Sequence, residues 1–122
     1  MGYRSNVAAL LYVTDKTRLP ELKLWLTENF PIEEFGEDIR WFDRGIILEC
    51  NDVKWYDSFP DVQKFNNAAQ AFIDLFCVGN IEVFGGAYEF MRIGEEYEDI
   101  EALNEGDCDY LLECTRSIDI VI

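Results

Sequence analysis

The chain has 122 residues, a length that suits one domain and is too short for two ordinary ones. Hydrophobic residues make up 49% of it, which excludes intrinsic disorder and provides enough apolar surface for a core without disulfide or metal cross-links. The 25 acids and 10 bases give a formal net charge of −15. That charge excludes direct binding of nucleic acid through phosphate neutralisation, and it argues against docking on a membrane of anionic lipid.

Several chemistries and compartments are also excluded. The chain has no histidine, which removes His-based catalytic triads and His metal sites. No apolar run is long enough to span a bilayer, and the apolar stretch from Val7 to Val13 is too short for a signal peptide. The four cysteines form no Cys-x-x-Cys pair, since they lie at Cys50, Cys77, Cys108 and Cys114. We therefore expect a cytoplasmic protein with reduced cysteines and no cofactor.

The first half of the chain predicts a strand, a helix and a hairpin. Val7 to Val13 is apolar on both faces, as in a central strand that is covered on each side. Leucines at helical spacing predict a helix from Thr17 to Asn29, and Phe30-Pro31 ends it because the residue before proline avoids the helical region. A tight turn at Arg44 predicts a hairpin with strands from Ile39 to Asp43 and from Gly45 to Asn51.

The second half predicts a longer helix and then strands. Apolar side chains from Pro60 to Val78 step by three and four residues, which indicates an amphipathic helix. Ile81 to Ile93 is rich in strand-forming residues and has a bulge or bend at Gly85-Gly86. The following acidic segment predicts one helical turn around Ile100 to Leu103, and the alternating residues from Tyr110 to Ile122 predict a final strand.

These elements follow one another in the order β-α-β-β-α-β-β. The first six match the split β-α-β pattern of ferredoxin-like folds, in which both helices cover one face of an antiparallel sheet. We therefore expect residues 1–122 to form a single acidic α+β domain of this type with an extra C-terminal strand.

The negative charge is concentrated near the C-terminus. Residues 82–122 contain 12 acids and 2 bases, whereas residues 1–81 contain 13 acids and 8 bases. A concentrated field of one sign does not stabilise a fold, so a binding role is one explanation for it and a solvated face is the other. If displayed on one side, the net charge of −15 corresponds to the phosphates of about seven base pairs, and it would imitate nucleic acid.

The predicted partner-binding residues combine carboxylates with two aromatic side chains. Trp55 and Tyr56 are neighbours and point to opposite faces if the chain is extended, so one of them is expected to be exposed and to anchor an interface. Core packing is the alternative role for both. The acids of the predicted surface are Glu95, Glu96, Glu98, Asp99, Glu101, Glu105, Asp107 and Asp109.

The other candidate sites are weak. Asp107 and Asp109, with Glu105 and Glu113 nearby, offer oxygen ligands to a divalent cation, but they lack the spacing of a calcium-binding loop. We therefore predict no metal site. Neighbouring acids in a polar segment lack the burial that separates the pKa values of a catalytic pair, and Cys77 has no histidine to activate it. The protein is accordingly expected not to be an enzyme.

Three segments carry a resemblance to a known group of proteins. These are Met1-Gly2-Tyr3-Arg4-Ser5, Lys54-Trp55-Tyr56 and the stretch from Phe90 to Glu101. In them the chain resembles small acidic proteins encoded by phages and prophages. The resemblance implies an inhibitor of host defence, of the anti-CRISPR or anti-restriction type. The many aromatic residues favour an interface in which carboxylates surround an aromatic patch.

The expected function is therefore that of a phage-encoded, non-enzymatic inhibitor in the host cytosol. Its expected partner is a basic host protein that binds nucleic acid, either an effector complex or a nuclease, whose nucleic-acid site the acidic surface would occupy. One alternative is an immunity or antitoxin-type protein that blocks a nuclease toxin. The other is a regulatory domain that binds a small ligand in a defined pocket.

Overall fold

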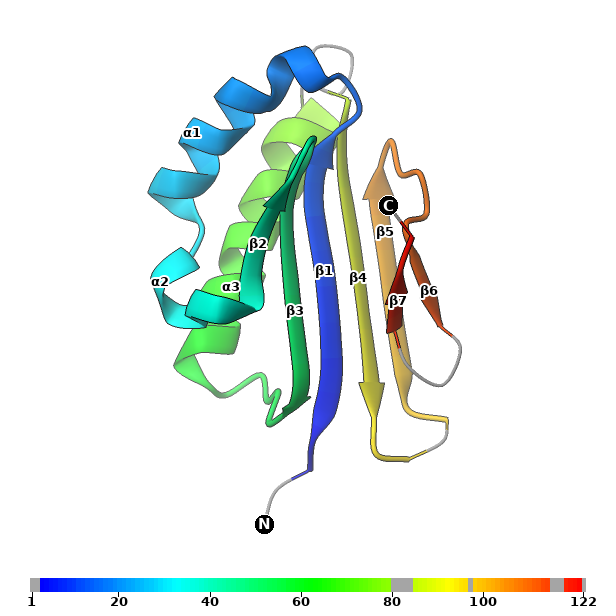
Figure 1. The fold of residues 1–122 in the computed structure, drawn as a ribbon. Coiled ribbons are helices and arrows are strands. Elements are labelled where there is room, and N and C mark those ends of the chain that lie inside the picture. The colour runs from blue at the N-terminus through cyan, green and yellow to red at the C-terminus, as the bar shows by residue number, and fades with distance from the viewer. Residues whose placement is uncertain (1–2, 80–84, 97, 115–117, 122) are drawn as a thin grey trace.

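The computed structural model describes residues 3–79, 85–96, 98–114 and 118–121. Its centre is a five-stranded antiparallel sheet in the order β2-β3-β1-β4-β5 (Figure 1). A separate two-stranded hairpin follows. The strands of the sheet are β1 (Ser5–Val13), β2 (Ile39–Phe42), β3 (Gly45–Val53), β4 (Gly86–Gly94) and β5 (Ile100–Gly106), and those of the hairpin are β6 (Leu112–Cys114) and β7 (Ile118–Ile120).

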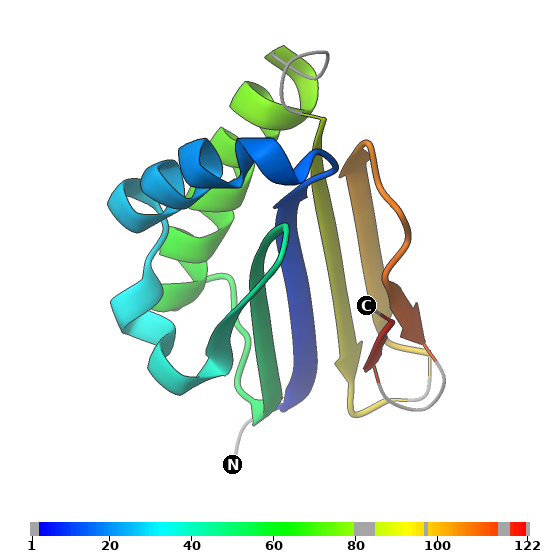
Figure 2. The same ribbon diagram turned by 45° about the horizontal axis from the view of Figure 1, so that its top comes forward.

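Three α-helices lie on one face of this sheet, and Figure 2 shows the hairpin on the other side. They are α1 (Leu19–Asn29), α2 (Ile32–Phe35) and α3 (Pro60–Phe72), and a π-helical segment (Ile73–Gly79) continues α3. Short 3₁₀ turns precede α1 (Lys16–Arg18) and follow α2 (Gly36–Asp38). None of the helices in these described ranges is both long enough and apolar enough to cross a membrane.

Local sequence explains where the first helix begins and ends. The side chain of Asp15 accepts a hydrogen bond from the backbone N–H of Thr17 (3.0 Å) and caps the turn that leads into α1. Pro20 lies in the first turn, where its missing N–H costs no hydrogen bond. At the other end, Phe30 turns to an extended conformation ahead of Pro31, as the residue before proline prefers.

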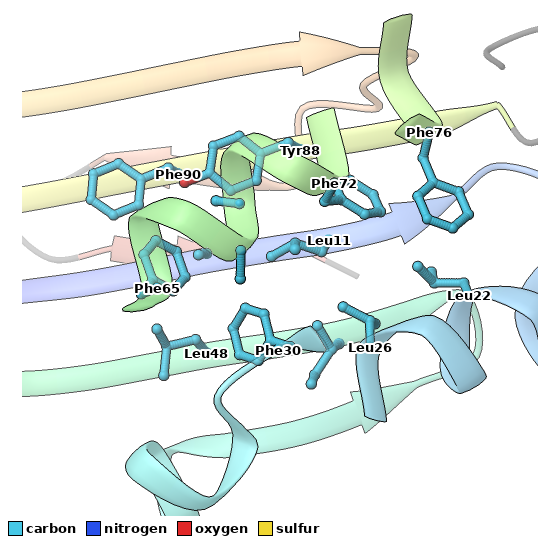
Figure 3. Close-up of a cluster of buried hydrophobic side chains, with 14 of the residues drawn as sticks. Leu11, Leu22, Leu26, Phe30, Leu48, Phe65, Phe72, Phe76, Tyr88 and Phe90 are labelled. Carbon is cyan, nitrogen blue, oxygen red and sulfur yellow. The ribbon is translucent and has the colours of Figure 1, made fainter. Parts of the chain in front are cut away.

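The main core lies between the helices and the sheet and is largely aromatic. The ring of Phe65 on α3 lies 5.8 Å from that of Phe30, 5.4 Å from that of Trp55 and 6.0 Å from that of Phe90, measured between centroids. Figure 3 shows side chains from β1, β3 and β4 meeting those of α1 and α3 in this cluster. Such packing removes a large apolar area from water and fixes both helices to the same face.

A second, smaller core lies on the opposite face beneath the hairpin. Leu10, Tyr12 and Ile47 are buried there, and Leu112 and Ile120 of the hairpin pack against them. The apolar appearance of Val7 to Val13 on both faces is thereby explained, since each face of β1 has its own cover.

The structure confirms the α+β class and the antiparallel sheet, and it corrects several local predictions. The helical turn expected at Ile100 to Leu103 is wrong, because these residues belong to strand β5 and pair with β4. The expected single final strand is instead the β6–β7 hairpin, and α2 adds a helix that the sequence pattern did not predict. The part of the predicted strand that covers residues 80–84 lies outside the described residues.

Candidate partner-binding site

Strand β5 extends beyond the part of the sheet that the helices cover. Every residue of β5 is exposed, although the strand belongs to the main sheet. On the helix side, between α3 and β5, lies a groove of about 500 Å³, which we call the β4–β5 groove. Its lining is Tyr3, Trp55, Tyr56, Asp57, Asn66, Tyr88, Phe90, Arg92, Asp99, Glu101 and Leu103.

The two aromatic residues predicted as anchors both form one wall of this groove. Trp55 is half-buried and contacts the aromatic cluster of the main core, with its ring 6.3 Å from that of Phe90. Tyr56 is also half-buried, packs on Phe59 (4.9 Å between ring centroids) and accepts a hydrogen bond from the backbone N–H of Tyr3 (2.5 Å). The expectation that one of the pair is exposed is therefore wrong, because both side chains are half-buried by packing while they also face the groove.

A network around Arg92 holds one end of the groove. The guanidinium donates to both oxygens of Asp99 (2.7 and 3.1 Å) and to Glu101 (2.8 Å). The hydroxyl of Tyr3 donates to the same Asp99 carboxylate (2.6 Å). Hydrogen bonds from Arg92 and Tyr3 hold the pKa of Asp99 below its ordinary value, and the hydrogen bonds of Arg92 to Asp99 and Glu101 raise the pKa of Arg92. This end of the groove is therefore a fixed ion pair with both partners charged at neutral pH.

We expect Asp99→Asn to weaken the acid dependence of folding stability. Because the folded-state pKa of Asp99 is lowered, its contribution is present above the unfolded value and is lost as the pH falls through the folded value. In urea unfolding, the free energy of unfolding should therefore be lower for Asp99→Asn than for wild type at pH 6 to 7, about two units or more above the ordinary carboxyl pKa. This difference should shrink as the pH is lowered. Glu98→Gln controls for the loss of one charge, and a difference independent of pH would contradict this role.

Tyr88 places a polar atom at the floor of the groove. Its side chain is only 4% exposed and stacks beside Phe90, toward which its hydroxyl oxygen points (Figure 3). Burial raises the pKa of this hydroxyl, so it remains protonated and can donate a hydrogen bond. Among the described residues, no side chain or backbone group forms a hydrogen bond with it. No fully buried side-chain oxygen or nitrogen of the described residues lacks a hydrogen-bond partner, so this hydroxyl reaches the surface of the groove, where it is a candidate ligand contact.

The outer edge of β5 offers unpaired backbone groups. Two backbone hydrogen bonds show which residue pairs of β4 and β5 are hydrogen-bonded. They run from the Gly94 N–H to the Asp99 carbonyl (2.8 Å) and from the Asp107 N–H to the Gly86 carbonyl (3.0 Å). Hydrogen-bonded pairs alternate along an antiparallel ladder. The backbone groups of Ala102 and Asn104 therefore point away from β4, and no described residue pairs with them. This edge can accept a further strand.

The eight predicted acids follow β5 from one end to the other. Glu95, Glu96 and Glu98 lie exposed in the connection that enters β5, and Asp107 and Asp109 follow its end. Seven strand residues separate these two groups by roughly 20 Å. Asp99 and Glu101 line the groove, Glu105 shares their face of β5, and all eight lie on or next to this strand.

Three of these acids pair with two arginines, which offset two of the three negative charges. Arg92 pairs with Asp99 and Glu101, and Arg44 pairs with Asp109 (2.5 Å). Glu95 accepts a hydrogen bond from the backbone N–H of Arg4 (3.0 Å). Five acids have no cationic partner among the described residues and carry most of the unbalanced charge of this edge: Glu95, Glu96, Glu98, Glu105 and Asp107. The structure therefore has an acidic surface along β5, but its net negative charge is smaller than the sequence indicates.

The described residues offer little for metal or thiol chemistry. No group of three or more potential metal ligands is found within these ranges, Asp107 and Asp109 included. Burial raises the pKa of the Cys77 thiol to about 12 and that of Cys108 to about 11. Both are therefore uncharged thiols at neutral pH and poor nucleophiles.

Sequence reasoning found the acids and the two aromatic residues of the groove wall but not its floor. The alternation of Tyr88, Phe90 and Arg92 does predict one shared face. The position of that face beside an uncovered strand depends on β5, which the sequence did not indicate. The chain was compared with protein-family models, with curated proteins and with solved structures, and none of the three comparisons gave a match.

Proposed function

We propose that this protein is a non-enzymatic inhibitor that binds a basic, nucleic-acid-handling protein through the exposed β5 edge and its carboxylates. The observation that carries the proposal is the exposure of β5 along its whole length, with Glu105 and Asp107 unpaired among the described residues. These carboxylates would occupy the cationic surface on which the partner holds phosphates, and the exposed Leu103 would add apolar contact. The bound partner could then no longer take up nucleic acid.

The setting of this proposal is the cytosol of a phage-infected cell, as the resemblance to small phage proteins implies. The partner would be a defence effector complex or a nuclease. An immunity or antitoxin-type protein that blocks a nuclease toxin would use the same surface, so the captured partner distinguishes the two. The proposal also takes β1 to β4 with α1 and α3 as a ferredoxin-like core, which the strand order β2-β3-β1-β4 supports.

The chemistry of the groove favours binding over catalysis. Asp99 and Glu101 both pair with Arg92, and the lowered pKa of the Asp99 carboxyl makes it a poor general acid at neutral pH. A regulatory domain for a small ligand is the second candidate, because the β4–β5 groove is a defined depression with an aromatic floor. That function predicts ligand-dependent thermal stabilisation with little sensitivity to salt.

A matched pair of charge-reversal variants tests the proposed function. Glu98→Lys/Glu105→Lys/Asp107→Lys reverses unpaired acids along β5. The control, Glu28→Lys/Glu33→Lys/Glu37→Lys, changes the net charge equally on the helical side. Wild type and control should capture nucleic-acid-binding proteins from a bacterial lysate, and duplex DNA or high salt should displace them. The β5 variant should lose at least about 100-fold in affinity for the captured protein, roughly 1 kcal/mol for each reversed charge.

Equal capture by the two variants would exclude the β5 edge as the binding surface. Capture that DNA does not displace would show that the partner is held elsewhere than at its nucleic-acid site. Circular dichroism of both variants confirms that the fold is retained, and retention is expected because all six positions are exposed.

A further inference from the structure

We infer that a basic segment of the partner adds to β5 as a sixth strand and places an arginine side chain in the β4–β5 groove. This inference rests on the proposed function and specifies how the edge recognises its target. It assigns separate roles to the backbone of β5, to the carboxylates on one of its faces and to the hydroxyl of Tyr88.

The backbone of β5 supplies the first part of the recognition. The N–H and C=O groups of Ala102 and Asn104 point outward, and among the described residues nothing pairs with them. An extended peptide gains main-chain hydrogen bonds at such an edge, independently of its sequence. In antiparallel pairing it forms hydrogen-bonded pairs with Ala102 and Asn104. Its residues opposite Glu101, Leu103 and Glu105 then lie on the groove side.

The side chains on that face define what the added strand carries. Glu101 and Glu105 flank Leu103, which is 52% exposed. Glu101 shares Arg92 with Asp99, so the two carboxylates keep one net negative charge, and the Glu101 side chain is itself exposed. Opposite charges and apolar pairs stabilise directly opposed positions on neighbouring strands. The matching segment is therefore five residues long. Its first and fifth residues are arginine or lysine, its third is apolar, and its second and fourth can be any residue.

The groove favours arginine at one of these positions. A new strand lies about 10 Å from β4, two strand spacings away, so only a long side chain crosses β5 to reach the groove floor. The largely buried side chain of Tyr88 offers a hydroxyl without a described partner at the groove surface, beside the rings of Phe90 and Trp55. Planar guanidinium stacks on aromatic rings and donates several hydrogen bonds, which an ammonium group on a flexible stem does less well.

A second copy of this chain is a poor occupant of the same edge. Antiparallel pairing of two β5 strands about Leu103 would place Glu101 of each strand opposite Glu105 of the other. Like charges directly opposite one another destabilise a strand pair. Charge complementarity thus selects a basic segment over self-association.

A short synthetic peptide tests this mode directly. The probe is the capped peptide Thr-Arg-Thr-Val-Thr-Arg-Thr, labelled for fluorescence anisotropy. The same composition in the order Thr-Thr-Arg-Arg-Val-Thr-Thr controls for charge, because it puts the two arginines on opposite faces. We expect the first peptide to bind wild type at least about tenfold more tightly than the second.

Three variants separate the parts of the site. Asn104→Pro removes an N–H that points outward, a change that an edge strand tolerates, and it should weaken peptide binding at least about tenfold. Asn104→Ala keeps this N–H donor and should bind the peptide like wild type. Ala102→Pro repeats the test at the other outward position if Asn104→Pro fails to fold. Tyr88→Phe should cost about fivefold through one lost hydrogen bond, and only with the arginine peptide, not with its lysine version.

The inference is overturned if wild type shows no binding up to about 1 mM peptide, if both peptide orders bind equally, or if Asn104→Pro binds like Asn104→Ala. Light scattering that showed dimers through β5 would overturn it as well. If partner capture still responds to the charge reversals in any of these cases, the proposed function stands and only the strand-addition mode fails. Loss of charge-dependent capture would remove both.

Discussion

Glu89→Ala is expected to destabilise the protein by about 4 kcal/mol, because it removes the acceptor for three buried or half-buried donors. Glu89 lies on β4, is fully buried and faces the hairpin side of the sheet. Its carboxylate accepts from the backbone N–H groups of Leu111 (2.7 Å) and Leu112 (3.2 Å) and from the hydroxyl of Tyr12. That hydroxyl in turn accepts from the N–H of Asp109 (2.7 Å).

This network attaches the C-terminal hairpin to the sheet. Urea unfolding measures the loss of stability, and hydrogen exchange of the Leu111 and Leu112 amides shows where it acts. Glu89→Gln keeps the shape and one acceptor oxygen, so it should cost about half as much. A change below about 1 kcal/mol for Glu89→Ala, or amides that stay protected, would show that the hairpin is held by its apolar contacts alone.

Phe65→Ala is expected to cost about 4 kcal/mol, because Phe65 fills the centre of the aromatic cluster. The ring is fully buried, and it contacts Phe35 (6.2 Å between centroids) in addition to Phe30, Trp55 and Phe90. Its loss leaves a cavity whose walls come from different elements and cannot collapse together. The unfolding midpoint in urea is the measurement.

Phe65→Leu is the matched control, since it keeps most of the volume and should cost about half as much. If Phe65→Ala were no worse than Phe65→Leu, the cluster would be able to close around the gap. Because Trp55 is a wall of the β4–β5 groove, Phe65→Ala should also weaken peptide binding at that groove. Phe65 does not line the groove, so this effect would act through the position of Trp55.

Elements with a strong local pattern could be predicted from the sequence. The 3.6-residue spacing of Val62, Phe65, Ala69 and Phe72 places α3, and the continuous apolar run of Val7 to Val13 places β1. The tight turn at Arg44 places the β2–β3 hairpin. In α3 and β1 the residues that specify the element are the residues that it buries, whereas the hairpin is specified by its turn.

Strand β5 could not be predicted in the same way. Its sequence contains alanine, asparagine and glutamate, which are poor strand formers, and all of its residues are exposed. The pattern of burial that identifies a strand is therefore missing, and pairing with β4 decides its conformation. Gly106 ends the strand with a positive φ of 82°, and a Cβ there would lie 2.2 Å from the Gly86 carbonyl oxygen.

Trp41 shows that a shared strand face does not by itself establish burial. Sharing a strand face with Ile39 indicates a core position, yet Trp41 is 37% exposed and carries the ammonium group of Lys23 over its ring at 5.2 Å. Strand β2 is the other edge of the sheet, and the exposure of Trp41 shows that its side chains are not fully covered there. Alternation shows which side chains share a face, but it does not show how far the cover extends.

The sequence by itself determined the acidity, its concentration in the last third of the chain and the residues that form the main core. Only the tertiary structure decided which carboxylates are neutralised, since the pairing of Arg44 with Asp109 joins residues 65 positions apart. It also decided that Glu89 is buried as a shared acceptor and that β5 is left uncovered beside an aromatic groove. Charge and periodicity are properties of neighbouring residues, whereas ion pairing and exposure depend on contacts that folding alone creates.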